Sequence, residues 1–76
     1  MISTDNKYRH IFFERLKDLR EEKGLSQSAL AREIKLITQS AITKWELQHT
    51  EPSATMLMIV ADYFDVTVDY LLGREA

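Results

Sequence analysis

The chain has 76 residues, a formal net charge of −2 and no cysteine. A chain of this length forms one domain with a small core, and without cysteine it has neither disulfides nor thiol chemistry. No run approaches the roughly 20 apolar residues of a membrane span, and the first residues lack the apolar run of a signal peptide, which predicts a cytosolic protein. We expect a single domain over residues 1–76 with a flexible N-terminal tail at residues 1–6.

The charge is unevenly distributed along the chain. Residues 1–50 carry nine Lys or Arg against seven Asp or Glu, whereas residues 51–76 carry one against five. Residues 1–50 would therefore tolerate a bound polyanion, whereas residues 51–76 would repel it. This difference would orient a complex between the chain and a polyanion. The overall balance is not the strongly basic one that announces a nucleic-acid binder by itself.

The first third of the chain has the apolar spacing of an α-helix. From about Lys7 the apolar residues recur at three- and four-residue steps, at Tyr8, Ile11, Phe12, Leu16 and Leu19. Gly24 suits the left-handed position that ends a helix. Ser26 is a good N-cap for a second helix that extends to about Lys35, and its buried stripe consists of Leu30, Ala31 and Ile34.

A third helix is expected from Thr38, as its N-cap, to Glu46. Ile42 is its inward anchor, and Trp45 is expected to be half-buried packing. The other faces carry amide, hydroxyl and ammonium groups, which can contact base edges and phosphate oxygens. These groups belong to Gln39, Ser40, Thr43 and Lys44. Taken alone, the stretch is more typical of an ordinary amphipathic surface helix.

Two further helices are expected after a break at Pro52. Ser53 caps the fourth, Thr67 caps the fifth, and Gly73 follows the fifth. Five short helices without β-alternation predict an all-α domain in which helices two and three form a helix-turn-helix. The last two helices are more apolar than one core layer requires, which favours a dimer surface there. Its candidate residues are Met56, Met58, Tyr63, Tyr70 and Leu72.

No pattern indicates an enzyme. His10 and His49 are isolated from the Cys, Asp or second His that a metal site or a triad needs. Glu21 and Glu22 are adjacent on a helix and point in different directions, which argues against paired acid and base groups. We expect no catalytic residue, no metal, no cofactor and no small-molecule ligand.

With the helices placed, the motifs resemble those of the lambda-type phage repressor and Cro family, the Xre-like helix-turn-helix regulators. The resemblance covers about residues 9–74 and is specific as an ordered set, although each motif alone is weak. The matching positions are Leu16, Leu19, Arg20, Gly24, Leu25, Ser26, Gln27, Leu30, Ala31, Gln39, Ser40, Ile42, Lys44, Trp45, Glu46, Pro52, Ser53, Leu57, Val60, Ala61, Phe64, Val66, Thr67, Asp69, Tyr70, Leu71, Leu72 and Gly73.

The resemblance implies a five-helix lambda repressor-like domain whose third helix lies in the major groove of double-stranded DNA. It also implies a phage or bacterial transcription repressor that acts in the cytoplasm as a homodimer on a palindromic operator. Gln39, Ser40 and Lys44 would read bases, and Arg20 with Glu46 would form a bridge that holds the third helix at a fixed angle. The expected DNA-binding residues are Ser26, Gln27, Thr38, Gln39, Ser40, Thr43 and Lys44. The resemblance implies that Ser26 and Gln27 hold phosphates and that Thr43 lies near the backbone or a thymine methyl.

Two features depart from the family pattern. Lys35 stands where the family commonly has Gly, and the interval from Ile34 to Ile42 is one residue longer. The extra residue either extends the second helix or widens the turn. The loop at residues 47–51 lacks the usual Asn-Gly and basic residues, which predicts weaker phosphate anchoring there.

The negative net charge and the poorly basic loop favour an alternative function. In this alternative the helix-turn-helix fold is a protein-interaction module, such as an antitoxin or a regulator-binding subunit. Its contact surface would be the acidic C-terminal part of the chain.

Overall fold

The computed structural model describes residues 9–74, which form five α-helices and contain no strand. The helices are α1 (Arg9–Glu22), α2 (Gln27–Glu33), α3 (Gln39–Glu46), α4 (Ala54–Phe64) and α5 (Val68–Leu72). The all-α prediction is confirmed, whereas the expected tail at residues 1–6 lies outside the described residues. No helix in the described range is long and apolar enough to cross a membrane.

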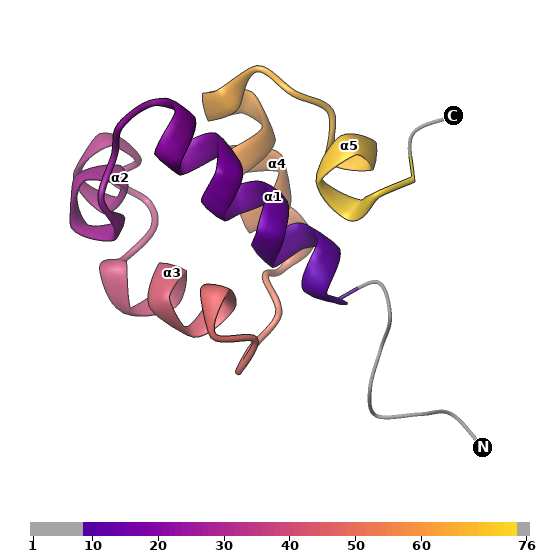
Figure 1. Cartoon of the computed structure of the whole chain (residues 1–76), viewed down its shortest axis with the longest axis horizontal. Coiled ribbons are helices and arrows are strands. Elements are labelled where there is room, and N and C mark those ends of the chain that lie inside the picture. Colours follow the sequence, from indigo (N-terminus) through magenta and orange to yellow (C-terminus); the bar gives the residue numbers. More distant parts are fainter. Residues whose placement is uncertain (1–8, 75–76) are drawn as a thin grey trace.

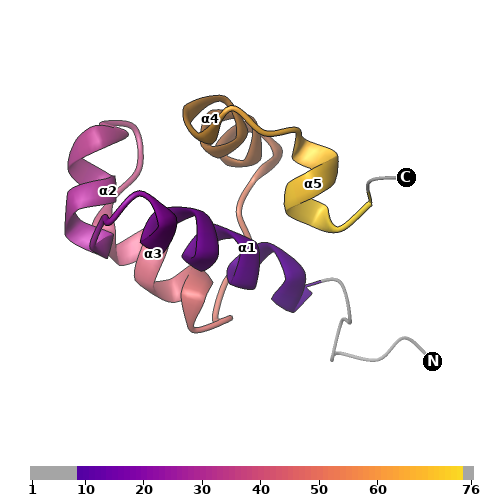
Figure 2. The same cartoon turned by 45° about the horizontal axis from the view of Figure 1, so that its top comes forward.

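Helix α1 runs through the centre of the molecule (Figures 1 and 2). It contacts α3 on one side and α5 on another, while α2 packs against α3 and α4 against α5. A central helix must bury more than one face. Phe13 is accordingly buried beside Phe12, although it lies off the apolar stripe expected for this helix.

The core draws on all five helices and on the α2–α3 turn. Its buried apolar residues are Phe12, Phe13, Leu16, Leu30, Ile34, Ile37, Ile42, Trp45, Val60, Ala61, Phe64 and Leu71. The expectation of a half-buried Trp45 was wrong, because the residue is only 4% exposed. The ring of Phe12 packs edge-on against its indole with centroids 5.8 Å apart, so α1 covers a side chain that α3 alone would leave partly in water.

Four hydroxyl side chains begin the helices as the sequence predicts. Ser26, Thr38, Ser53 and Thr67 have extended backbone, and each accepts a hydrogen bond from the N–H three residues later, at 2.9–3.1 Å. These bonds satisfy donors that the first helical turn leaves without partners. Gly24 adopts φ +69°, as expected at the end of α1.

The second helix ends at Glu33, so the expectation that it extends to about Lys35 was wrong. Ile34 leaves the helical region with φ −101° and ψ 87°. The chain turns there because Ile34 and Ile37 are both buried, and the Ile37 N–H donates to the Ile34 carbonyl at 3.0 Å. The extra residue therefore widens the turn, which occupies residues 34–38.

Gln48, just after α3, has a left-handed backbone with φ +62°. This conformation strains a residue that carries a Cβ, whereas glycine adopts it freely. We expect Gln48→Gly to raise the free energy of unfolding by about 0.5–1 kcal/mol, measured by urea denaturation. Gln48→Ala keeps the strain and is the matched control, so an equal gain in both variants would contradict this interpretation.

Candidate nucleic-acid interface

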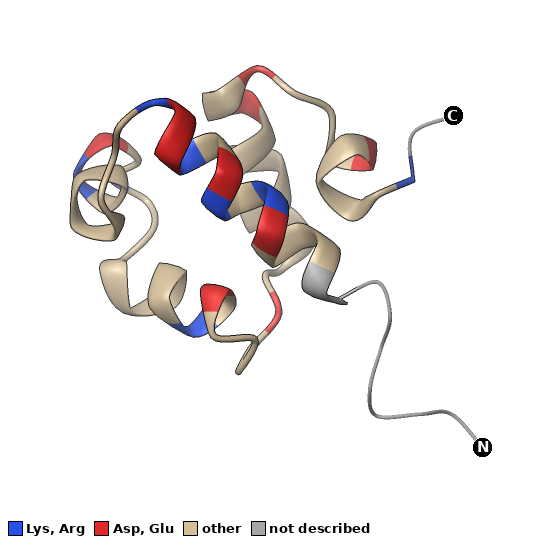
Figure 3. Cartoon of the chain, in the orientation of Figure 1, with Lys and Arg blue, Asp and Glu red and all other residues tan. Residues whose placement is uncertain are grey.

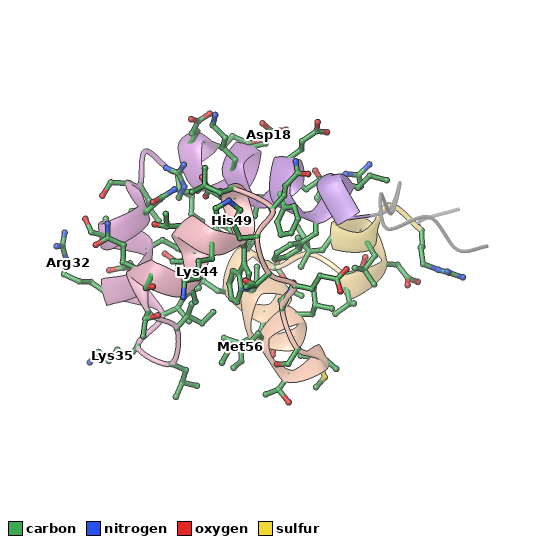
Figure 4. The ribbon with its side chains drawn as sticks, turned by 90° about the horizontal axis from the view of Figure 1, so that it is seen from below. Asp18, Arg32, Lys35, Lys44, His49 and Met56 are labelled. Atoms are coloured by element: carbon green, nitrogen blue, oxygen red, sulfur yellow. The ribbon has the colours of Figure 1, made fainter. Side chains whose placement is uncertain are left out.

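The outer face of α3 carries the polar side chains to which the family resemblance assigns base reading. Gln39, Ser40 and Lys44 are exposed, whereas Ile42 and Trp45 on the opposite face are buried. No described carboxylate lies within ion-pair distance of Lys44. In Figure 4 Lys44 lies in the middle of the face seen from below. The helix therefore has one side fixed in the core and one side open to a ligand.

Thr38 begins this helix and is exposed. Its Oγ1 accepts a hydrogen bond from the Ala41 N–H at 3.1 Å, which leaves the hydroxyl hydrogen available. A hydroxyl can accept and donate at once, so the capping role and a contact to an anionic oxygen are compatible.

Thr43 of α3 and Gln27 of α2 face each other where the two helices pack together. The Thr43 hydroxyl donates to Gln27 Oε1 at 2.6 Å, and Gln27 Nε2 donates to Glu46 Oε1 at 3.0 Å. Both side chains are half-buried. The amide of Gln27 therefore ties the start of α2 to α3, a contact that the sequence does not reveal because it depends on how the two helices cross.

Arg20 of α1 and Glu46 of α3 form a two-pronged ion pair. Arg20 Nε and Nη2 donate to Glu46 Oε2 and Oε1, each at 2.8 Å, and Nη1 donates to the Leu25 carbonyl at 2.8 Å. The two side chains are 10% and 8% exposed, so solvent screens the pair weakly. The hydrogen bonds to Glu46 raise the pKa of Arg20 above its ordinary value, although burial opposes the shift.

These contacts form one continuous network. Glu46 Oε1 accepts from both Arg20 and Gln27, and Gln27 accepts from Thr43. The network joins α1 directly to α3 through Arg20 and Glu46, and it joins α2 to α3 through Gln27. The network fixes the direction of α3 relative to α1 and α2. The exposed side chains of α3 therefore keep a fixed position relative to the rest of the domain.

Ser26, at the start of α2, is exposed and has two close partners. Its Oγ accepts from the Ala29 N–H at 3.0 Å and lies 3.2 Å from Ser28 Oγ. Ser26 directly precedes Gln27, whose helix α2 packs against α3. Its hydroxyl remains accessible to solvent.

Charge differs between the outer side of α1 and the α3 side. Among the described side chains of α1, the exposed charged residues are four acidic and one basic: Glu14, Lys17, Asp18, Glu21 and Glu22. Helix α3 carries Lys44 and the paired Glu46 (Figure 3). Arg32 and Lys35, outside the set of residues predicted to bind DNA, are exposed near the end of α2. Their position beside the long turn is the sequence signal that could have drawn attention to them.

The loop between α3 and α4 offers little positive charge. Leu47 is exposed, and His49, also exposed, donates its backbone N–H to the Lys44 carbonyl at 2.8 Å. Figure 4 places His49 on the same viewed face as Lys44. The loop contains no Lys or Arg, and its one carboxylate is Glu51.

The candidate dimer residues on α4 and α5 differ in exposure. Met58 is 53% exposed, while Met56, Tyr63, Tyr70 and Leu72 are half-buried. Both tyrosines have partners within the chain. The Tyr63 hydroxyl donates to Glu33 Oε1 at 3.3 Å, and the centroid of the Tyr70 ring lies 4.2 Å from the guanidinium carbon of Arg15. Met58 is the member of the set with the most free apolar surface.

Comparison with known proteins agrees with this geometry. A family model described as helix-turn-helix matches residues 16–71, a range that contains α2, the turn and α3. The chain belongs to this helix-turn-helix family. The resemblance to lambda-type phage repressors and Cro, drawn from the motifs, is confirmed at the level of the family.

Two curated relatives show the range of proteins that share the domain. The chain is 38% identical over 64 residues to the HTH-type transcriptional activator BcrR of Enterococcus faecalis, covering 84% of this chain and 31% of that protein. It is 38% identical over 66 residues to the uncharacterized HTH-type transcriptional regulator YqaE of Bacillus subtilis, covering 87% and 56%. The chain thus spans about half the length, or less, of these relatives.

A solved structure shares the fold. The solution structure of the SOS-response transcriptional repressor LexA from Eubacterium rectale matches with a TM-score of 0.80 at 21% identity. The match covers 92% of this chain and 73% of that chain. The lambda repressor-like architecture predicted from the sequence is therefore confirmed.

Proposed function

We propose that this domain is the DNA-binding part of a transcription regulator and that α3 reads base edges in the major groove. The observation that carries the proposal is the two-sided character of α3. Ile42 and Trp45 fix one side in the core, and Gln39, Ser40 and Lys44 leave the other side open. An α-helix fits the major groove, where each base pair presents its own pattern of donors and acceptors.

The chemistry of the open side suits sequence reading. A Gln amide pairs with adenine N6 and N7, a Lys ammonium with guanine O6 and N7, and a Ser hydroxyl with either kind of edge. Thr38 and Ser26 supply exposed hydroxyls that can donate to phosphate oxygens and set the register of the domain on the duplex. Gln27 and Thr43 act mainly by positioning α3, because their side-chain groups bond to each other.

The proposal includes a two-fold dimer that binds a palindromic operator in the bacterial cytoplasm. Relatives with the same domain carry the names transcriptional activator and transcriptional regulator, which supports a role in transcription. Met58 and the neighbouring surface of α4 and α5 are the proposed dimer contact. We propose that the dimer represses transcription by occupying promoter DNA and blocking the polymerase.

The salt dependence of binding tests this function. Few cations lie on the α3 side, so the slope of log K against log salt should be shallower than the roughly −10 known for the lac repressor. Fluorescence anisotropy with a labelled duplex across a salt series measures the slope. A slope as steep as −10 would contradict the interface proposed here. Absence of binding to any member of a randomised duplex pool, with tight capture of a partner protein, would favour the interaction-module alternative.

A further inference from the structure

The wide α2–α3 turn holds two exposed residues on a rigid base. Ile34 is 6% exposed and Ile37 is 4% exposed, so both ends of the turn are anchored in the core. The Ile34 N–H donates to the Leu30 carbonyl at 2.8 Å, and the Ile37 N–H donates to the Ile34 carbonyl at 3.0 Å. Lys35 and Leu36 lie between these anchors and are exposed. The turn therefore projects the Lys35 side chain from a fixed backbone.

Arg32, three residues earlier, adds a second cation. Arg32 and Lys35 are both exposed, and within residues 9–74 neither has a carboxylate at ion-pair distance. The carboxylate between them in sequence, Glu33, accepts a hydrogen bond from Tyr63 of α4. Figure 4 shows both cations projecting from the same edge of the domain.

The chain itself keeps this pair close to the start of α3. Lys35 precedes Thr38, the N-cap of α3, by three residues, and three residues span at most about 11 Å. An exposed cation of α1, Lys17, has a different setting, because it lies among the carboxylates of Glu14, Asp18 and Glu21. Arg32 and Lys35 therefore lie near the start of α3, the helix proposed to enter the major groove. In this position they can neutralise phosphates.

We propose that Arg32 and Lys35 form a second contact to the DNA backbone, outside the bases that α3 reads. The proposal rests on the proposed function and adds a phosphodiester site to it. The extra residue in the turn has the role of carrying Lys35 outward from the Ile34 and Ile37 anchors. The contact contributes affinity without sequence preference, because phosphates are the same along the duplex.

A charge-neutral double variant, Arg32→Gln with Lys35→Gln, tests the contact. The operator is first selected with the parent protein, and binding is then measured by anisotropy across a salt series. Each lost phosphate contact lowers the salt slope by about 0.9, so the double variant should lose about 2 per bound protomer. Binding should weaken alike for all sequences, and the base preference should stay that of the parent. Lys17→Gln, which removes one exposed charge from α1, is the matched control and should leave the slope unchanged.

A duplex with single neutral methylphosphonate linkages locates the contact. Linkages flanking the half-site should weaken binding of the parent but not of the double variant. If the parent binds the operator and the double variant keeps the parent slope, the turn contact is wrong while the proposed function stands. If the parent binds no duplex, the proposed function fails and the turn contact fails with it. Both side chains are exposed, so thermal melts of parent and variant should coincide and exclude misfolding as the cause.

Discussion

Arg20→Ala should lower the free energy of unfolding by about 3–5 kcal/mol, the range for removing one partner of a buried ion pair. The substitution leaves the Glu46 carboxylate, 8% exposed, without the guanidinium that compensates its charge. It also removes the hydrogen bond to the Leu25 carbonyl that holds the α1–α2 connection. For a domain of this size the melting temperature should fall by roughly 12 °C or more, measured by circular dichroism.

Two further variants separate the ion pair from simple loss of packing. Arg20→Lys keeps the charge but cannot reach both Glu46 oxygens and the Leu25 carbonyl together, so its stability should lie between parent and Arg20→Ala. The double variant Arg20→Ala with Glu46→Ala leaves no unpaired buried charge and should lose less than the sum of the two single variants. A melt of Arg20→Ala that coincides with the parent melt would show that the bridge does not stabilise the fold.

Gln39→Ala and Lys44→Ala should each weaken operator binding by about 1–3 kcal/mol and relax the base preference at one position of each half-site. Both side chains are exposed and neither supports the core, so the melting temperature should not change. The measurement is the affinity for the operator compared with single-base variants of it. Loss of affinity without loss of discrimination would move these residues from base reading to backbone contact.

Gln27→Ala is the natural contrast to these two variants. It removes the hydrogen bonds to Thr43 and Glu46, so α3 should lose part of its fixed direction without losing a base-reading group. Binding to all sequences should weaken alike. If Gln27→Ala instead changed the preferred base at a single position, Gln27 would itself read a base.

Local rules account for the parts of the fold that the sequence predicts. Ser26, Thr38, Ser53 and Thr67 satisfy donors only three residues away, so their role follows from neighbouring residues alone. The exposure of Gln39, Ser40 and Lys44 follows in the same way, because helical spacing places them on faces of α3 other than the face of Ile42. The ion pair of Arg20 with Glu46 is not local, and the expectation of it came from the family resemblance.

Contacts between helices account for what the sequence does not predict. Phe13 is buried because α1 is covered on more than one side, and Trp45 is buried because Phe12 lies over it. The end of α2 at Glu33 depends on the burial of Ile37, which is a property of the assembled core. The Gln27 and Thr43 hydrogen bond likewise requires the crossing of α2 over α3.

Selection of bound sequences from a pool of randomised duplexes tests the central claim most directly. With the parent protein we expect enrichment of one sequence with two-fold symmetry, whose half-sites lie about one helical turn apart. The same selection with Gln39→Ala should keep the symmetry and lose the preference at one position of each half-site. A pool that shows no enriched sequence after repeated rounds would contradict base reading by α3.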